Sequence, residues 1–133
     1  MERYKRQINL PQVGTEGQQK LLNTSVLIIG AGGLGCAILP YLSASGIGTI
    51  GIIDGDRIEK SNLQRQVLFS EDSIGELKVN IVASKLRVIN SETNIKIYPE
   101  FLDPENAISI IKNYDIIVDA PDTVALRYLI NDA

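Results

Sequence analysis

The chain has 133 residues, of which 44% are hydrophobic, and a formal net charge of −3 at pH 7. This length predicts one domain with a sizeable core, and the acidic balance disfavours a broad nucleic-acid-binding surface. No histidine is present, so the usual general base and every catalytic triad that depends on one are excluded. The one cysteine, Cys36, cannot form an internal disulfide framework or a zinc site, and it suits a reducing cytoplasm.

The N-terminal region, residues 1–24, is predicted to be a basic arm followed by a short helix. The arm, Glu2 to Leu10, contains Arg3, Lys5 and Arg6 and reads either as a solvated segment or as a functional one. A helix is expected from Thr15 to Leu22, with Thr15 as its N-cap. Because Met1 to Leu10 is charged and polar, it is no secretory signal, and we expect a cytoplasmic protein.

A Rossmann-like nucleotide-binding domain is expected over residues 25–133, and its first half carries the strongest motif. A short β-branched run from Val26 to Ile29 is followed by a glycine cluster, an apolar-periodic helix, a second buried run from Thr49 to Ile53, and Asp54. This is the dinucleotide-binding pattern G-x-G-x-x-G with a carboxylate about twenty residues further on. The glycines would let the backbone approach a phosphate, and the carboxylate would accept hydrogen bonds from ribose hydroxyls. The predicted nucleotide-binding glycines are Gly30, Gly32, Gly33 and Gly35.

No charged residue occurs from Leu21 to Ile53, which gives this stretch the hydropathy of a membrane span. Glycine, proline and serine residues interrupt it, and a parallel strand that is buried on both faces reads similarly. We therefore expect no membrane association. Within this stretch Pro40 lacks an N–H and its ring would clash with the carbonyl of Cys36, so a kink or early break of the helix is expected.

The second half continues the alternation of strands and helices. A long polar loop from Asp54 to Ser73 carries hydrophobic residues that suggest it folds back on the domain, and such loops are usually functional. The elements predicted after it are a helix from Gly75 to Asn90, a strand from Ile95 to Tyr98, a helix from Pro104 to Asn113, a strand from Asp115 to Val118 and a last helix from Thr123. This order predicts an α/β fold, a doubly wound and mostly parallel sheet that is truncated after about four strands. We therefore expect the domain to be incomplete at its C-terminal end.

The carboxyl ends of the predicted strands bring together more polar groups than a hydride-transfer domain needs. Cations near a phosphate site indicate reaction at a phosphate, where catalysis is mainly positioning and charge stabilisation. Lys78 is expected in the first turn of its helix, an unfavourable place for a cation unless an anion binds there. Attack by a carboxylate on the α-phosphate of ATP needs no base, and Asp122 or Asp56 would hold the accompanying Mg²⁺. The residues expected at this edge are Asp54, Asp56, Asn62, Arg65, Gln66, Lys78 and Asp122.

The motifs RYKRQINL, GAGGLG, IDGD, SNLQRQ, GELK and DAPDT, in this order, resemble those of the MoeB/ThiF/HesA family, which is related to the ubiquitin-activating enzymes. The resemblance runs from Arg3 to the end of the chain. It implies an ATP-dependent adenylyltransferase that activates the C-terminal glycine of a ubiquitin-like sulfur-carrier protein, as in molybdopterin or thiamine biosynthesis.

The resemblance also implies a role for individual residues. Asp54 would bind the ribose, while Asn62, Arg65 and Lys78 would hold the phosphates of ATP. Asp122 would coordinate Mg²⁺, although the sequence APDT around it departs from the family's more usual pattern.

The resemblance further implies that Arg6 reaches the triphosphate bound to a neighbouring subunit, so that the enzyme is a homodimer. A second half that often carries two zinc-binding C-x-x-C pairs is absent from these residues, which leaves the competence of the isolated chain open.

Three alternatives remain at this point. The glycine loop and Asp54 alone would serve an NAD-dependent oxidoreductase. A relative in the same superfamily would activate a tRNA modification. A pseudoenzyme subunit would bind a partner without catalysis, against which the complete set of cations argues.

Overall fold

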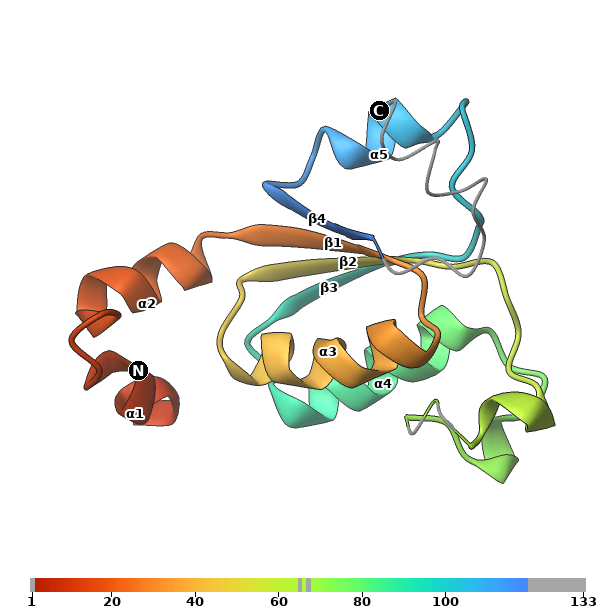
Figure 1. Cartoon of the computed structure of the whole chain (residues 1–133), viewed down its shortest axis with the longest axis horizontal. Helices are drawn as coiled ribbons and strands as arrows, with labels where there is room; N and C mark the ends of the chain where they lie inside the picture. The colour runs from red at the N-terminus through yellow and green to blue at the C-terminus, as the bar shows by residue number, and fades with distance from the viewer. Residues whose placement is uncertain (1, 65, 67, 120–133) are drawn as a thin grey trace.

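The computed structural model describes residues 2–64, 66 and 68–119. Its centre is a sheet of four strands, β1 (Ser25–Ile29), β2 (Thr49–Ile53), β3 (Asn94–Tyr98) and β4 (Ile116–Asp119). All three strand pairs are parallel and the order is β3-β2-β1-β4. Helices α3 (Gly33–Ala44) and α4 (Lys78–Ile89) cover one face of the sheet, and α5 (Ala107–Ile111) covers the other (Figure 1). The Rossmann-like fold is confirmed.

The strands read as continuous apolar runs because they are buried on both faces. Alternate residues of β1 enter two different cores. Val26 and Ile28 pack with α3 and α4, whereas Leu27 and Ile29 pack with α5. All four side chains are buried, so each face of β1 contributes to holding a helical layer in place.

The N-terminal arm contains a 3₁₀ turn (Glu2–Tyr4) and helices α1 (Lys5–Ile8) and α2 (Gly14–Leu22). It lies at the end of the molecule where the strands begin (Figure 1). Tyr4 anchors it, since this side chain is buried and its hydroxyl accepts a hydrogen bond of 2.8 Å from Asn90 Nδ2. The prediction that Thr15 caps α2 is wrong: the N-cap is Val13, and no side chain bonds the free N–H groups there.

Several boundaries differ from the predictions by a few residues, among them β4, which is Ile116–Asp119 rather than Asp115–Val118. Three differences have a structural cause. Helix α4 begins at Lys78 rather than Gly75, because the residues before it pair with the loop that follows β2. Helix α5 begins at Ala107, after a turn in which the Asp103 carboxylate accepts backbone hydrogen bonds. Pro40 does not break α3, which continues to Ala44; Leu39 beside it is fully buried, so tertiary packing holds this turn.

The long loop after β2 folds back on the domain as expected. Phe69 is buried in the core beneath α3 and α4. Ile58 exchanges backbone hydrogen bonds of 2.8 Å with Glu76 and Gly75, which ties the loop to the start of α4. The loop also contains two 3₁₀ turns, Lys60–Asn62 and Glu71–Ser73. In the described part of the chain, no helix has the length and apolar character needed to span a membrane.

Candidate nucleotide-binding site

The glycine loop lies where β1 ends and α3 begins. Gly30 adopts a φ of +98°, in the left-handed region that favours glycine, and its N–H donates to the Ile53 carbonyl at 2.9 Å. A Cβ on Gly35 would collide with the carbonyl oxygen of Gly30, so this glycine permits the helix to approach the strand closely. Gly32 is the N-cap of α3 and Gly33 its first residue, so the free N–H groups of the helix start at this loop.

Asp54 joins this loop to the next strand. The side chain is 8% exposed, and its Oδ2 accepts a 2.7 Å hydrogen bond from the N–H of Ala31. Its Oδ1 accepts another, also of 2.7 Å, from the N–H of Asp56. A carboxylate oxygen has a further lone pair for a ligand. Asp54 therefore fixes the loop geometry as well as lying where a ribose would be bound, and the first of these roles was not apparent from the sequence.

The hydrogen bonds of Asp54 to Ala31 and to Asp56 form a bracket between the two loops, and a polar cavity of about 290 Å³ lies beside this bracket at Asp56. Lys78, in the first turn of α4, is 3% exposed, and its Nζ is 4.0 Å from Oδ2 of Asp56. An ammonium group in such a buried place needs anionic partners. The residues that line the cavity are Asp56, Arg57, Glu59, Asn62 and Lys78. Three of these were predicted as site residues, and Arg57 and Glu59 were not.

Asn62 and Gln66 reach the site region from the loop after β2. Asn62 Oδ1 accepts a 2.8 Å hydrogen bond from the N–H of Glu59, which caps the 3₁₀ turn Lys60–Asn62. Gln66 does not line the cavity. It is 1% exposed, and its Oε1 has no hydrogen-bond partner among the described residues.

Cys36, in the first turn of α3, is buried beside the glycine loop. Its thiol donates to the Ala31 carbonyl at 3.3 Å. Burial raises the pKa of the thiol to about 11, although the nearby Lys78 ammonium and a backbone hydrogen bond from Leu68 oppose the rise. The Asp54 carboxylate adds a smaller increase to this pKa. The thiol is therefore protonated near neutral pH, as expected of a packing residue.

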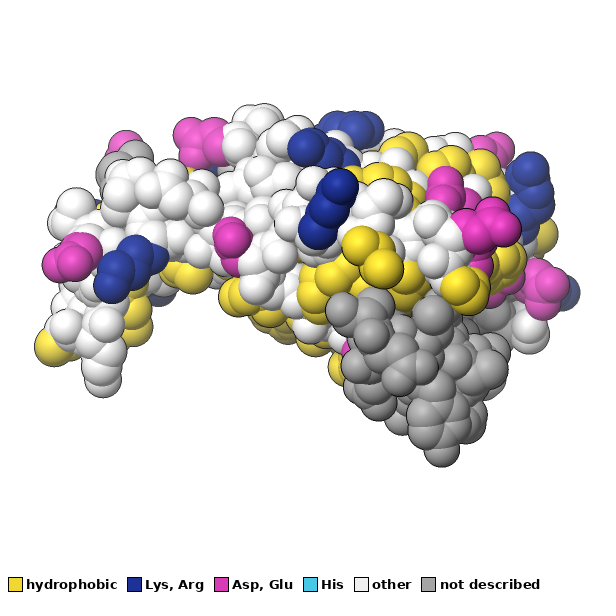
Figure 2. Space-filling view, turned by 90° about the horizontal axis from the view of Figure 1, so that it is seen from above, with side chains coloured by type: hydrophobic (Ala, Val, Ile, Leu, Met, Phe, Trp, Pro, Cys, Tyr) yellow, Lys and Arg dark blue, Asp and Glu magenta, His cyan; other side chains and the backbone are white. Residues whose placement is uncertain are grey.

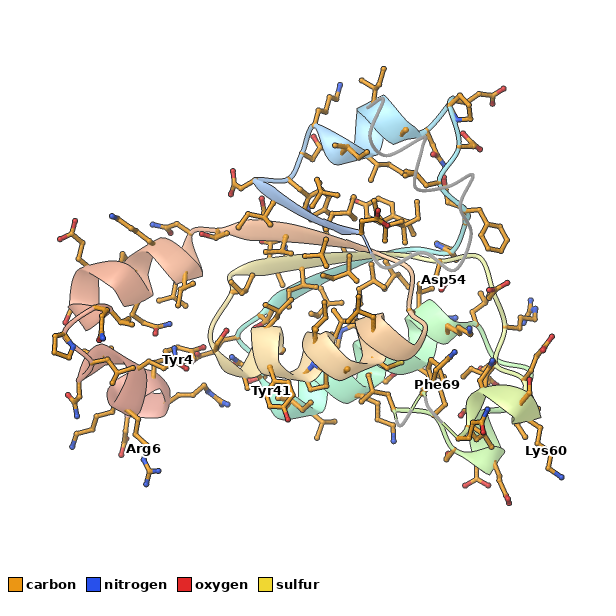
Figure 3. The ribbon with its side chains drawn as sticks, viewed as in Figure 1. Tyr4, Arg6, Tyr41, Asp54, Lys60 and Phe69 are labelled. Carbon is orange, nitrogen blue, oxygen red and sulfur yellow. The ribbon has the colours of Figure 1, made fainter. Side chains whose placement is uncertain are left out.

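Arg6 is far from this site. It is exposed on α1, at the end of the molecule opposite Asp54 (Figure 3). The structure thus does not bring Arg6 together with the other predicted residues of the same chain. The predictions for Arg65 and Asp122, and the predicted helix from Thr123, fall outside the described residues.

Asp119 is a residue of this edge that the sequence reasoning did not select. It ends β4, pairs in register with Ile29 at the end of β1, and its buried Oδ1 has no hydrogen-bond partner in the described part of the chain. The strand order reverses between β1 and β4, and ligands of doubly wound sheets bind in the crevice at such a point. The position at the end of a buried strand was the available signal. The described residues contain no cluster of three or more metal-binding side chains.

The fold and this edge define a Rossmann-like domain with a phosphate-binding type of glycine loop. The chain belongs to the ThiF family, whose family model matches residues 4–133.

Its relatives include the sulfur carrier protein adenylyltransferase of Thermus thermophilus, 47% identical over 133 residues, which are the whole of this chain and 49% of that protein. The adenylyltransferase and sulfurtransferase MOCS3 of Xenopus laevis is 52% identical over 130 residues, 98% of this chain and 29% of that protein. This chain thus spans half or less of these two relatives.

Solved structures agree with this assignment. The chain resembles the E. coli tRNA N6-threonylcarbamoyladenosine dehydratase TcdA with a TM-score of 0.91 and 27% identity, over 98% of this chain and 54% of that one. The same enzyme in complex with ATP aligns with a TM-score of 0.86 and 28% identity, over 92% of this chain and 50% of that one.

Proposed function

We propose that the protein to which this chain belongs is an ATP-dependent adenylyltransferase that activates the C-terminal glycine carboxylate of a ubiquitin-like sulfur-carrier protein. The relatives that are named adenylyltransferases support this activity, and the name of the Thermus relative supports the carrier. The observation that carries the proposal is the buried ammonium of Lys78 in a polar cavity, which Asp56 and Asp54 connect by hydrogen bonds to the glycine loop. Its ion-pair partner Asp56 is 4.0 Å away and has a side chain that is 52% exposed, so a triphosphate would add the anionic charge that the buried ammonium favours.

The reaction matches the side chains available. A carboxylate oxygen of the carrier attacks the α-phosphorus of ATP, the bond from that phosphorus to the bridging oxygen breaks, and pyrophosphate leaves with the electron pair. The nucleophile is already ionised at neutral pH, so no general base is needed, in keeping with a chain that has no histidine. Catalysis then consists of positioning and of stabilising phosphate charge.

The residues divide this work between them. The glycine loop holds the nucleotide through the start of α3, and Asp54 uses its remaining lone pairs on the ribose. Lys78, Asn62 and Arg65 hold the phosphates. Asp56 orients Lys78 through their 4.0 Å ion pair. Gln66 belongs to the same loop, and a shift of this buried side chain would let its amide oxygen, which has no partner among the described residues, bind the nucleotide.

ATP normally carries Mg²⁺, and the donors at the crevice fit this hard cation. Asp119 presents a buried carboxylate oxygen that has no partner in the described residues. We assign Asp122, three residues further along the chain, as the principal ligand, and Asp119 as a second ligand. The ion would neutralise charge on the triphosphate.

Arg6 acts across a subunit interface in this proposal, so the enzyme is a homodimer. Within one chain the exposed Arg6 and the bracket at Asp54 lie at opposite ends (Figure 3). Helix α3 lies between these ends and has no charged residue. Leu34 and Tyr41 are exposed on it, and the labelled Tyr41 points away from the sheet, so an apolar surface is available for a second copy. A cytoplasmic location is part of the same proposal, supported by the free and buried Cys36.

The choice of nucleotide separates this proposal from the oxidoreductase alternative. The whole protein is titrated with ATP and with NADH in an isothermal calorimeter. It should bind ATP and should not bind NADH at equal concentrations. Micromolar binding of NADH without ATP binding would overturn the proposal. The likeness to TcdA supports a second candidate, activation of a tRNA modification. That candidate predicts ATP hydrolysis that is stimulated by tRNA and unaffected by a carrier protein.

A further inference from the structure

The loop between β3 and α5 carries an aromatic ring that the site described above does not use. Phe101 is 57% exposed, although the next residue, Leu102, is buried in the core beneath α5. Its ring lies against the backbone of Gly55, where an added Cβ would be 2.7 Å from Cδ2 and Cε2 of the ring. Gly55 directly follows Asp54. The exposed ring thus lies beside the proposed ribose-binding carboxylate.

Hydrogen bonds hold the backbone on both sides of this ring. Asn106 Nδ2 donates to the Phe101 carbonyl at 2.9 Å, and Asn106 Oδ1 accepts from the N–H of Asp103 at 2.8 Å. The backbone at the start of the loop is joined to β2, since Asp54 N–H donates to the Tyr98 carbonyl at 3.2 Å. A hydrophobic ring that is supported in this way and left largely open suits a planar ligand.

The strand order gives the direction in which a nucleotide would extend. The phosphates belong to the glycine loop at β1 and the ribose to Asp54 at β2, so the base continues toward β3, the next strand in the sheet. Adjacent strands are roughly 4.8 Å apart, and β3 is therefore about 10 Å from β1. This is the scale of a nucleoside monophosphate. The loop that follows β3 is the one that carries Phe101.

The charges of this loop agree with a base rather than a phosphate. Residues 98–106 contain Glu100, Asp103 and Glu105 and no lysine or arginine. A triphosphate would be repelled there, whereas the cavity at Lys78 offers two cations, Lys78 and Arg57, beside its two carboxylates. Figure 2, which shows the face that carries α5, has hydrophobic and acidic side chains toward the end of the molecule that holds the carboxyl ends of the strands, with some basic side chains at the margin of that end.

We propose that Phe101 is the platform on which the adenine of ATP stacks, so that it determines affinity for the base while the Lys78 cavity holds the triphosphate. This inference rests on the proposed function of the site. Phe101 has no contact with the reacting phosphorus. Its stacking on the base contributes equally to substrate and transition-state binding. A substitution of Phe101 should therefore change KM without changing kcat.

The test compares ATP with inorganic tripolyphosphate, which has no base. In the whole protein, Phe101→Ala should raise the KM for ATP in ATP–pyrophosphate exchange about tenfold, within the range for base–aromatic stacking. It should leave kcat and the inhibition constant of tripolyphosphate unchanged. Phe101→Tyr should retain the parent KM, and Ile108→Ala, on the neighbouring helix and 69% exposed, is the matched control.

A fluorescence measurement gives an independent readout, because the chain contains no tryptophan. Addition of AMP should quench the emission of Phe101→Trp, and ribose 5-phosphate should not; Ile108→Trp should respond to neither. An unchanged KM in Phe101→Ala together with an unquenched tryptophan would overturn the proposal while leaving the proposed function intact. An equal loss of ATP and tripolyphosphate binding, or a raised KM for the carrier protein alone, would also overturn it. Failure of the parent protein to bind ATP would overturn both.

Discussion

The carboxylate of Asp54, at the end of β2, accepts a 2.7 Å hydrogen bond from the N–H of Ala31, which lies in the glycine loop at the end of β1. A second bond of 2.7 Å to the N–H of Asp56 extends this bracket to the loop that holds Lys78 in place. The residue expected to contact a ribose is thus also the residue that shapes the phosphate loop. Asp54 is therefore expected to serve both ligand binding and the local fold.

Asp54→Asn should therefore lower the stability as well as ATP affinity. The amide nitrogen of asparagine would face one of the two backbone N–H donors, leaving a buried donor unsatisfied at a cost of about 1–3 kcal/mol. The free energy of unfolding is measured by urea denaturation, with circular dichroism as the readout. Asp103→Asn is the control, since Asp103 is exposed and accepts both of its backbone bonds through Oδ1, an oxygen that asparagine retains. A loss in Asp103→Asn equal to that in Asp54→Asn would contradict the bracket.

Lys78→Met should separate phosphate binding from stability. We expect ATP–pyrophosphate exchange to fall by well over tenfold, on the order of 2–4 kcal/mol of lost phosphate stabilisation. The free energy of unfolding should stay the same or rise, because a buried ammonium is replaced by an apolar chain of similar length. Lys85→Met, on the exposed side of the same helix, should leave exchange unchanged. Arg65→Ala should lower exchange as Lys78→Met does. Near-parental exchange in both variants would show that the phosphates bind elsewhere.

The thiol of Cys36 should be inert in the folded protein. With a pKa of about 11 and a buried side chain, it should react with iodoacetamide near pH 8 at least about tenfold more slowly than after unfolding. In the unfolded chain the thiol ionises near pH 9, before it does so in the folded state. Its contribution to stability is therefore complete below about pH 9 and is lost as pH rises toward 11.

Cys36→Ala removes this dependence, so its stability should decline less between pH 9 and 11 than that of the parent. Burial and a hydrogen bond with Tyr98 also raise the pKa of Tyr114, which is why the comparison must be made between the two proteins. An identical decline in parent and variant would contradict the assignment.

Arg6 provides a test of the homodimer. Subunits with Arg6→Ala and subunits with Lys78→Met should each be inactive alone. When they are mixed, a dimer with one of each has one site with an intact Lys78 that faces an intact Arg6. Random mixing at equal amounts makes about half of the dimers mixed, and each mixed dimer has one active site out of two. About a quarter of the parent exchange activity should therefore return. Failure to recover any activity in mixed dimers of confirmed composition would count against action across the interface.

Much of this fold could be predicted because its signals are local. The β-branched run at Val26 and the run from Thr49 both became strands, and the glycine spacing placed the turn between β1 and α3 correctly. The long loop was expected to fold back because it carried residues such as Phe69. Each of these features depends on side-chain character along a short segment.

Other features depend on contacts between distant segments. The bond from Asp54 to Ala31 spans 23 residues, and pairing of the loop with the start of α4 shortened that helix and buried Lys78. The continuation of α3 through Pro40 likewise depends on its packing. Asp119 was not predicted because the motif DAPDT favours the aspartate at 122, whereas the end of β4 at Asp119 depends on its pairing with β1. The sequence motifs therefore indicate a nucleotide, whereas the pairing of the strands and loops determines which side chains lie close to it.

Carrier-dependent exchange tests the central claim most directly. Labelled pyrophosphate should enter ATP when the whole protein is mixed with a ubiquitin-like sulfur-carrier protein that ends in glycine. Exchange should be absent with the same carrier lacking its last glycine, because the attacking carboxylate is then misplaced. If exchange is equal with the intact and shortened carriers, or absent with every carrier although ATP binds, the protein does not adenylate a carrier.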